Sequence, residues 1–314
     1  MGTVPVVAVV GPTATGKTGL AVELALRFGG EVVSADSMQV YRGLEVGTAR
    51  PSEEEMRGVP HHMVGCADPR QPFSVADYVV AASECIRGIR GRGRLPVVAG
   101  GTGLYVRSLL GNIGFAPEGR SDALRAELRQ KAREEGTQSL LAELRTLDPE
   151  SAERIDPHNA ARLIRAIEIC RVTGLTMTEQ LRRSKENPPP YDVCMIGLSY
   201  RDRAKLYAAI DRRVDEMMRR GLLREAEAVL RLPDGCTAKQ AIGYKEFVPY
   251  FRGESTLEEA VESVKRESRR YAKRQLTWFR RDENAAWILR DDFASSDGVL
   301  ARSSAIVEGK GWRL

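Results

Sequence analysis

The segment from residue 11 to residue 18 reads Gly-Pro-Thr-Ala-Thr-Gly-Lys-Thr, the phosphate-loop spacing of Gly, four residues and Gly-Lys-Thr. Glycines at both ends of the loop allow the backbone to curl, so that successive N–H groups point at an anion. Lys17 adds a positive charge for the outer phosphate, and the Thr18 hydroxyl suits a Mg²⁺ ion. The sequence therefore predicts a diphosphate or triphosphate site made of Gly11, Pro12, Thr13, Ala14, Thr15, Gly16, Lys17 and Thr18.

The residues around this loop fit a strand, a loop and a helix in that order. The run Val4–Val10 is apolar and β-branched, as in a buried strand. After the loop, apolar residues from Leu20 to Phe28 recur at helical spacing, and Gly29 and Gly30 then predict a helix end. This order places a helix N-terminus under the phosphate, so a glycine-rich turn without a ligand is the weaker interpretation.

Two further polar segments follow predicted strands. Asp36 comes directly after the apolar Val32–Val33, and Gly100–Gly103 comes directly after Val97–Ala99. Open α/β sheets bind their ligands at the carboxyl ends of the strands, so we expect both segments to converge on the phosphate loop. Asp36 is a candidate metal ligand or general base there. An aspartate that only caps a turn explains the same position equally well.

The alternation of strands and helices predicts an α/β fold: a P-loop NTPase-like parallel sheet core flanked by helices, with an all-helical insertion domain. Residues 1–116 form the first part of the core, 117–190 the insertion and 191–314 the second part. The predicted strands are Val4–Val10, Glu31–Ala35, Leu95–Ala99 and Val193–Leu198. Helices are predicted near Ser74–Arg90, over Arg203–Leu230 and over Leu257–Phe279, with a loop through Gly243 between the last two, so we expect helices and no strand after residue 200.

Composition narrows the class of protein. The 314 residues are 42% hydrophobic and 29% charged, which is typical of a soluble globular enzyme. The sequence contains no run of 18 apolar residues, so we expect no membrane span. The start of the chain does not resemble a signal peptide. The five cysteines form no C-x-x-C pair and the three histidines are too few for a zinc site, so we expect reduced thiols in a cytoplasmic protein. We also expect the protein to act as a monomer.

A basic segment lies near the C-terminus. Between Glu262 and Arg281 there are eight Lys and Arg residues but only two acids, with Tyr271, Trp278 and Phe279 among them. Interleaved basic and aromatic residues are typical of a nucleic-acid surface. A solvated helix face whose aromatic residues pack on the core is an equally good interpretation of this pattern.

Several of these segments resemble the tRNA dimethylallyltransferases. The resemblance covers nearly the whole chain in order, and it implies transfer of a dimethylallyl group from dimethylallyl diphosphate to N6 of the adenosine 3′ of the anticodon, position 37, in tRNAs that read codons beginning with U. The matching segments are Gly11–Thr18, Asp36–Tyr41, Gly47–Pro51, Pro60–His62, Gly100–Tyr105, Ala241–Glu246 and Tyr271–Trp278.

The resemblance also implies roles for individual residues. Asp36 would be the general base, Thr102 would act at the diphosphate or at N6, and Arg213 would bind the diphosphate, with Mg²⁺ on Thr18. Without the resemblance, Thr102 is better explained as a turn residue and Arg213 as part of a surface ion pair. The implied contacts with the tRNA anticodon stem-loop are Asp36, Ser37, Met38, Gln39, Thr102, Arg125, Ala161, Arg162, Leu163, Ile164, Arg165, Gln240, Ala241, Ile242, Gly243, Tyr244 and Lys245.

The chain departs from the family pattern at one of these contacts. The family commonly has His-Pro-Asn-Asp-x-Gln-Arg where this chain has Asp156 to Arg162, and Ala161 therefore lacks an amide that could bind a base. We expect His61 and His62 to pack and to order their loop. The bases of the C-terminal helix, Lys265 and Arg269 included, are expected to contact tRNA phosphates. Two other functions use the same loop: a nucleoside or nucleotide kinase, and an RNA-binding module without enzymatic activity.

Overall fold

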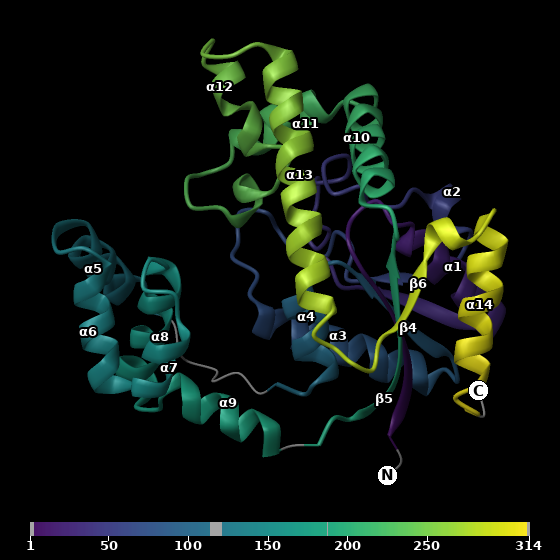
Figure 1. Ribbon diagram of the computed structural model, residues 1–314, viewed down its shortest axis with the longest axis horizontal. Coiled ribbons are helices and arrows are strands. Elements are labelled where there is room, and N and C mark those ends of the chain that lie inside the picture. Colours follow the sequence, from purple (N-terminus) through teal and green to yellow (C-terminus); the bar gives the residue numbers. More distant parts are fainter. Residues whose placement is uncertain (1–2, 114–120, 187, 313–314) are drawn as a thin grey trace. The chain divides into compact units, whose positions relative to one another are not determined.

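The computed structural model describes residues 3–113, 121–186 and 188–312, and it divides into two compact units (Figure 1). One unit consists of Met1–Leu109 and Tyr191–Leu314, and the other of Leu110–Pro190. The expected boundary between residues 116 and 117 lies outside the described residues, as does Asn187. Within the described residues, none of the helices has both the length and the apolar character that a membrane span requires.

The first unit contains a six-stranded sheet in which every pairing is parallel, with the order β3-β2-β4-β1-β5-β6. The predicted parallel core is therefore confirmed. The expectation of helices without a strand after residue 200 is wrong, because β6 follows the long helix over Leu257–Phe279. This strand has four residues and β3 has two, which is too short for either to show a periodic pattern. The strands are β1 (Val4–Val10), β2 (Gly30–Ser34), β3 (His61–His62), β4 (Leu95–Gly100), β5 (Tyr191–Ser199) and β6 (Ala286–Leu289).

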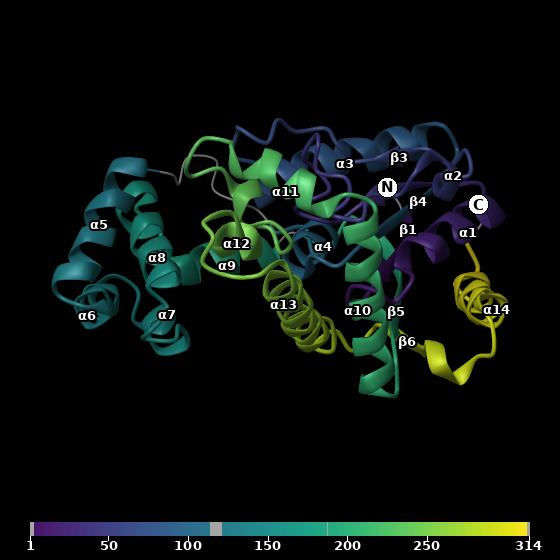
Figure 2. The ribbon, with the colours of Figure 1, turned by 90° about the horizontal axis from the view of Figure 1, so that it is seen from above.

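Helices cover both faces of this sheet (Figure 2). The connection from β1 to β2 runs in one direction along the sheet and the connection from β3 to β4 runs back. Because parallel crossovers are right-handed, the helices of these two connections lie on opposite faces. The helices before β5 in this unit are α1 (Lys17–Phe28), α2 (Glu53–Met56), α3 (Val75–Gly91) and α4 (Gly103–Leu110, whose last residue belongs to the second unit).

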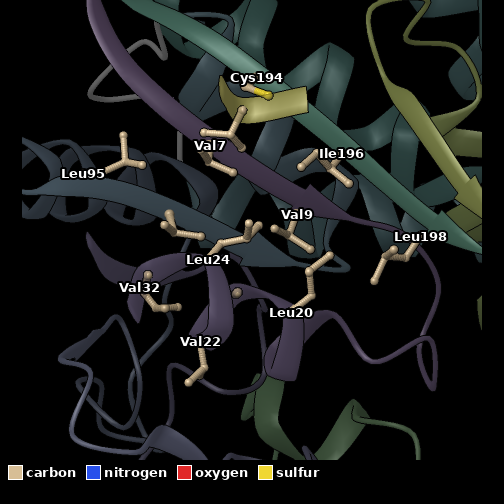
Figure 3. Packing of buried hydrophobic residues seen from close by; sticks show 14 of the residues in the cluster. Val7, Val9, Leu20, Val22, Leu24, Val32, Leu95, Cys194, Ile196 and Leu198 are labelled. Carbon is tan, nitrogen blue, oxygen red and sulfur yellow. The ribbon is translucent and has the colours of Figure 1, made fainter. Parts of the chain in front are cut away.

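The main core lies between one face of the sheet and α1 (Figure 3). Alternate residues of a strand point to the same face, so Val7 and Val9 of β1 both face this core. Leu20 and Leu24 of α1 pack against them, spaced one helical turn apart. Val6, Ala8 and Val10 are equally buried, because helices cover both faces of the sheet.

The chain after β5 is helical except for β6. The predicted helix over 203–230 is divided at Gly221, whose positive φ of 95° ends one helix and begins the next. The predicted helix over Leu257–Phe279 has these bounds. The elements are α10 (Arg203–Arg219), α11 (Leu222–Leu230), short 3-10 turns at Thr237–Gln240, Lys245–Phe247 and Arg290–Asp292, α12 (Val248–Phe251), α13 (Leu257–Phe279) and α14 (Ser296–Glu308).

Within its described residues, the second unit consists of helices joined by loops, without a strand. Leu128, Leu140, Leu144, Leu163 and Ile167 form its core and come from three of the helices. This core is separate from that of the sheet, as the predicted all-helical insertion requires. The helices are α5 (Asp122–Glu134), α6 (Thr137–Leu147), α7 (Pro149–Arg154), α8 (Ala160–Thr173) and α9 (Met177–Glu186).

Candidate active site

Three polar segments meet at the carboxyl ends of the neighbouring strands β2, β4 and β1, as the sequence predicts. Ala35 N–H donates to Ala99 O at 2.8 Å, and Thr102 N–H donates to Ala35 O at 3.1 Å. The Thr102 hydroxyl accepts a hydrogen bond from Ser37 N–H at 3.0 Å. These bonds hold the Asp36 turn directly against the glycine-rich turn after β4.

Gln275 of α13 joins the phosphate loop to the same glycine-rich turn. Its side-chain oxygen accepts a hydrogen bond from Thr13 N–H at 2.9 Å, and its side-chain nitrogen donates to Gly101 O at 2.9 Å. The side chain is buried. Sequence reasoning missed this residue, although its spacing of four from Tyr271 places both on one helix face.

Arg290 supports the phosphate loop from another direction. Its guanidinium donates to Thr15 O at 3.1 Å, and a Cβ atom at Gly16 would lie 2.1 Å from the same nitrogen. The positive φ of Gly16, 81°, is also a conformation that L side chains rarely adopt. Gly16 is therefore required by the turn, and a larger residue there would displace the end of the Arg290 side chain.

A pocket opens beside these segments, and all of its walls belong to the first unit. It brings together predicted site residues from four separate places in the sequence. Two helices, α10 and α13, line the pocket. The other lining residues come from the phosphate loop, from the turn after β2, from the loop before α2 and from the loop after α11. The lining residues are Thr13, Asp36, Ser37, Met38, Gly47, Thr48, Ile210, Arg213, Val214, Met217, Gln240, Ala241, Ile242, Gly243, Lys245, Val264, Ser268, Tyr271 and Arg274.

Asp36 uses one carboxylate oxygen for the local fold. Oδ1 accepts hydrogen bonds from Met38 N–H at 2.9 Å and from Gln39 N–H at 3.3 Å. The turn-capping interpretation of Asp36 is therefore confirmed. Oδ2 has no hydrogen-bond partner among the described residues, and Asp36 lines the pocket. The same side chain can thus cap the turn and accept a proton from a ligand.

Two cations face Asp36 in a poorly hydrated environment. Burial, and next the charge of Arg213, lower the pKa of Lys17 from 10.5 to about 7, while Asp36 opposes this shift. Burial also lowers the pKa of the Arg213 guanidinium, and Asp36 again opposes the shift. Lys17 Nζ donates to Pro12 O at 2.7 Å within its own loop. Two desolvated positive charges close together favour binding of an anion such as diphosphate.

The part of the pocket formed by α10 and α13 is apolar. Ile210, Val214 and Met217 lie at helical spacing on α10, and Val264 of α13 also lines the pocket. Burial raises the pKa of Tyr271 to about 12, so its hydroxyl stays protonated at neutral pH. The pocket therefore combines cations, one carboxylate and a hydrocarbon surface.

The comparisons with known proteins agree with this geometry. A family model described as IPP transferase matches residues 39–282, and a second, described as isopentenyl transferase, matches residues 4–64. The first model alone covers more than half of the chain. The chain belongs to the IPP transferase family.

Curated relatives in this family carry the name tRNA dimethylallyltransferase. The protein of Halalkalibacterium halodurans is 49% identical over 282 residues, 90% of each chain. That of Acetivibrio thermocellus is 44% identical over 297 residues, 94% of this chain and 95% of the relative. The chain thus matches these IPP transferases over nearly their full length.

Solved structures of the family have the same fold. The full-length tRNA isopentenylpyrophosphate transferase of Bacillus halodurans, 44% identical, covers 98% of both chains with a TM-score of 0.71. A eukaryotic dimethylallyltransferase described as acting on tRNA is 26% identical with a TM-score of 0.81, over 98% of this chain and 80% of that chain. The predicted P-loop-like fold and family are confirmed.

Of the predicted phosphate-loop residues, Thr13 alone lines the pocket, and three further site residues expected in the first unit do not line it. Thr102 is bonded to Ser37, as above. The Gln39 amide accepts from Ser34 Oγ at 2.9 Å and donates to Thr48 O at 3.2 Å, and the fully buried Tyr244 donates its hydroxyl to Glu225 at 2.8 Å. Their side chains position the loops that form the pocket.

The residues expected to contact tRNA in the second unit differ in accessibility. Leu163 and Ile164 are buried in the helical core, so their side chains cannot contact RNA in this conformation. Ala161 and Arg162 are exposed. Arg125 and Arg165 are partly exposed, and both guanidinium groups bind the fully buried Glu168, at 2.8 and 2.7 Å.

The basic residues of α13 differ in whether they are paired with acids. Lys265 pairs with Asp215 at 2.6 Å, and Arg269 pairs with Asp211 at 2.6 Å and with Glu262 at 2.7 Å. Because both side chains form ion pairs with acidic residues, we expect other basic side chains of this segment to contact phosphates instead. Within the part of the chain that the structure describes, Lys273, Arg274, Arg280 and Arg281 have no ion-pair partner.

His61 and His62 belong to the sheet and lie outside the pocket. His61 Nδ1 lies 2.8 Å from Val59 O, and His62 Nε2 lies 2.7 Å from the buried Glu31 carboxylate. Arg92 binds the same carboxylate and, as the largest cause, lowers the pKa of Glu31. Both histidines therefore have packing roles, as expected.

Proposed function

We propose that this chain transfers the dimethylallyl group of dimethylallyl diphosphate to N6 of the adenosine at tRNA position 37, next to the anticodon, in tRNAs that read codons beginning with U. The carrying observation is the pocket in which Arg213, the Asp36 carboxylate and an apolar surface lie together, close enough to Lys17 for Arg213 and Asp36 to act on its charge. The names of its relatives support the same reaction.

The reaction breaks the bond between the allylic carbon and the diphosphate oxygen and forms a bond from that carbon to N6. Negative charge develops on the leaving diphosphate, where the phosphate-loop N–H groups, Lys17 and Arg213 stabilise it. The attacking amine becomes strongly acidic as it is alkylated and loses a proton, which Asp36 Oδ2 accepts. This transfer requires N6 to come within about 3 Å of the carboxylate.

The apolar surface of α10 and α13 suits the hydrocarbon part of the donor. Ile210, Val214 and Val264 exclude water from the reacting carbon, which protects it from hydrolysis. A kinase would instead use the same space for a polar phosphate acceptor. The kinase alternative is therefore not favoured.

The donor set also suits a divalent metal held mainly by the substrate. The described residues contain no cluster of three or more His, Cys, Asp and Glu side chains that could hold a metal ion. Mg²⁺ commonly uses one or two protein ligands together with phosphate oxygens and water, so one hydroxyl at a phosphate site is sufficient. The Thr18 hydroxyl would hold the ion, which when bound neutralises diphosphate charge.

The tRNA needs a wider surface than the pocket. Asp36, Ser37, Met38 and residues 240–245 would receive the unstacked adenosine, which costs less to expose in a single-stranded anticodon loop than in a duplex. In the helical unit, the anticodon stem would contact Arg125, Arg162 and Arg165. The Lys and Arg side chains of α13 that have no ion-pair partner among the described residues would bind tRNA phosphates. We include in this proposal that the protein acts as a monomer in the cytoplasm.

A donor experiment tests this function against its alternatives. The protein is incubated with Mg²⁺, unmodified tRNA and either labelled dimethylallyl diphosphate or labelled ATP. Label in the tRNA only with dimethylallyl diphosphate supports the proposal. Phosphate transfer from ATP would support a kinase, and tRNA binding without transfer would support an RNA-binding module.

A further inference from the structure

Glu225 of α11 makes four hydrogen bonds outside the pocket. Its Oε2 accepts from the N–H groups of Glu45 and Val46, both at 2.8 Å. Its Oε1 accepts from Gly47 N–H at 2.7 Å and from the Tyr244 hydroxyl at 2.8 Å. Three successive backbone N–H groups that converge form an anion-binding concavity, and a side chain of the protein itself fills it here.

These bonds join two segments that are far apart in the sequence. Gly47 and Thr48 line the pocket from the loop before α2, and residues 240–243 with Lys245 line it from the loop after α11. Tyr244 is fully buried between them. A Cβ atom at Gly47 would lie 2.6 Å from the Tyr244 ring, so the two loops are in direct contact.

The phosphate side of the pocket has different supports. Gln275 holds Thr13, and Thr102 holds the Asp36 turn. Neither of these residues contacts Glu225 or Tyr244 through a hydrogen bond that the structure describes. The two ends of the pocket can therefore respond separately when one support is changed.

We propose that Glu225 is a positioning residue that sets the distance between segments 45–48 and 240–245, and so shapes the end of the pocket that accepts the base. The inference rests on the proposed function, because that function supplies the adenosine as acceptor. Glu225 does not touch the substrate in this account, and it makes no contribution to diphosphate binding. Charge-assisted hydrogen bonds are the stronger kind, so one carboxylate with four donors can fix both loops.

The Glu225→Gln variant tests this inference, since it keeps the size of the side chain. The side-chain NH2 group of the glutamine would replace one carboxylate oxygen. This group donates hydrogen bonds and cannot accept them from the backbone N–H groups or from Tyr244, so at least one of the four bonds is lost. We expect kcat/KM for tRNA to fall by about tenfold or more, mainly through KM, which is the usual scale for a lost charged hydrogen bond. The dissociation constant of inorganic diphosphate with Mg²⁺ should stay within about twofold of that of the unaltered chain, since Glu225 lies outside the phosphate site.

The matched control is Glu227→Gln on the same helix. Glu227 is exposed and contacts only Arg231, through an i,i+4 ion pair, among the described residues. Its kcat/KM for tRNA should be unchanged, because such surface pairs contribute little. If Glu225→Gln fails to fold, Tyr244→Phe gives the same comparison, since it removes one of the four bonds and keeps the ring. A fall in its kcat/KM of about threefold is expected.

The outcomes separate the inference from the function on which it rests. Unchanged tRNA kinetics in Glu225→Gln, or in Tyr244→Phe where that variant is used, would overturn the inference. Equal losses of diphosphate binding and tRNA turnover would also overturn it, because they indicate general damage to the fold. An unaltered protein that transfers nothing to tRNA would overturn the proposed function and this inference with it.

Discussion

The Thr102 hydroxyl accepts a hydrogen bond from the Ser37 N–H group at 3.0 Å, although the two residues are 65 positions apart in the chain. This bond ties the turn that contains Asp36 to the glycine-rich turn after β4. Because Asp36 Oδ1 is already used within its own turn, the bond also limits where Oδ2 can point. The Thr102 hydroxyl, which lies outside the pocket, therefore helps to position the Asp36 carboxylate inside it.

Replacement of Thr102 tests this relationship. Thr102→Val keeps the shape of the side chain but cannot accept the Ser37 hydrogen bond, so we expect kcat to fall by about tenfold. Thr102→Ser keeps the hydroxyl and should retain most of the activity. Steady-state kinetics with dimethylallyl diphosphate and tRNA measure both. Equal activity of the valine and serine variants would show that the hydrogen bond does not position Asp36.

Asp36→Asn separates proton transfer from substrate binding. Turnover should fall at least about 100-fold, the usual scale for a general base. Inorganic diphosphate should bind at least as tightly as before, because the change removes a negative charge that lies near Lys17 and Arg213. Near-normal turnover would exclude Asp36 as the base. Weaker diphosphate binding would instead point to a role in holding the metal.

Lys17 makes diphosphate binding depend on pH. Its pKa of about 7 in the free pocket means that most Lys17 side chains are neutral at pH 8. A bound anion favours the charged form and raises this pKa, so binding takes up a proton above pH 7. The affinity for diphosphate should then fall as pH rises from 7 to 9, by up to about tenfold per unit.

Calorimetry in two buffers of different ionisation enthalpy measures this proton uptake. Lys17→Arg is the matched control, since arginine stays charged over the whole range. Protonation of the diphosphate itself contributes equally to the proton uptake of both proteins. The difference in proton uptake between them therefore comes from Lys17. Equal proton uptake by the two proteins would contradict the assignment.

Much of this arrangement follows from the sequence. Glycine spacing and the preceding apolar run predict the phosphate loop, and strand ends predict where Asp36 and Gly100–Gly103 lie. These signals are local, so one segment of sequence contains each of them. The roles of Gln275 and Glu225 depend on which backbone groups come near them after folding, and neither has a local pattern.

Local sequence also fails to predict the short strand β6 and the burial of particular side chains. β6 pairs with β5 through only four residues, and nothing in its own length or periodicity distinguishes it from a loop. Leu163 and Ile164 lie in a segment that the family resemblance predicts to contact tRNA, yet helical periodicity places their side chains in the core. A family motif identifies the segment, and only the packing decides which of its side chains are accessible.

The ionic strength dependence of tRNA binding tests the role of α13. Lys273 and Arg274 have no ion-pair partner among the described residues, so the double change to alanine should reduce the slope of log K against log salt by roughly 1.5 to 2. Lys265→Ala should change the slope less, because Asp215 already neutralises that charge. Filter binding over a series of salt concentrations measures the slopes. A larger effect at Lys265 than at Lys273 and Arg274 together would contradict this assignment.

Transfer to adenosine 37 is tested directly with two tRNA transcripts that differ only in having adenosine or guanosine at position 37. Each is incubated with the protein, Mg²⁺ and dimethylallyl diphosphate, then digested to nucleosides and analysed by mass spectrometry together with the released diphosphate. The account predicts N6-dimethylallyladenosine from the first transcript alone, with one diphosphate released per modified nucleoside. No modified adenosine in the first transcript, or equal modification of both, would contradict it.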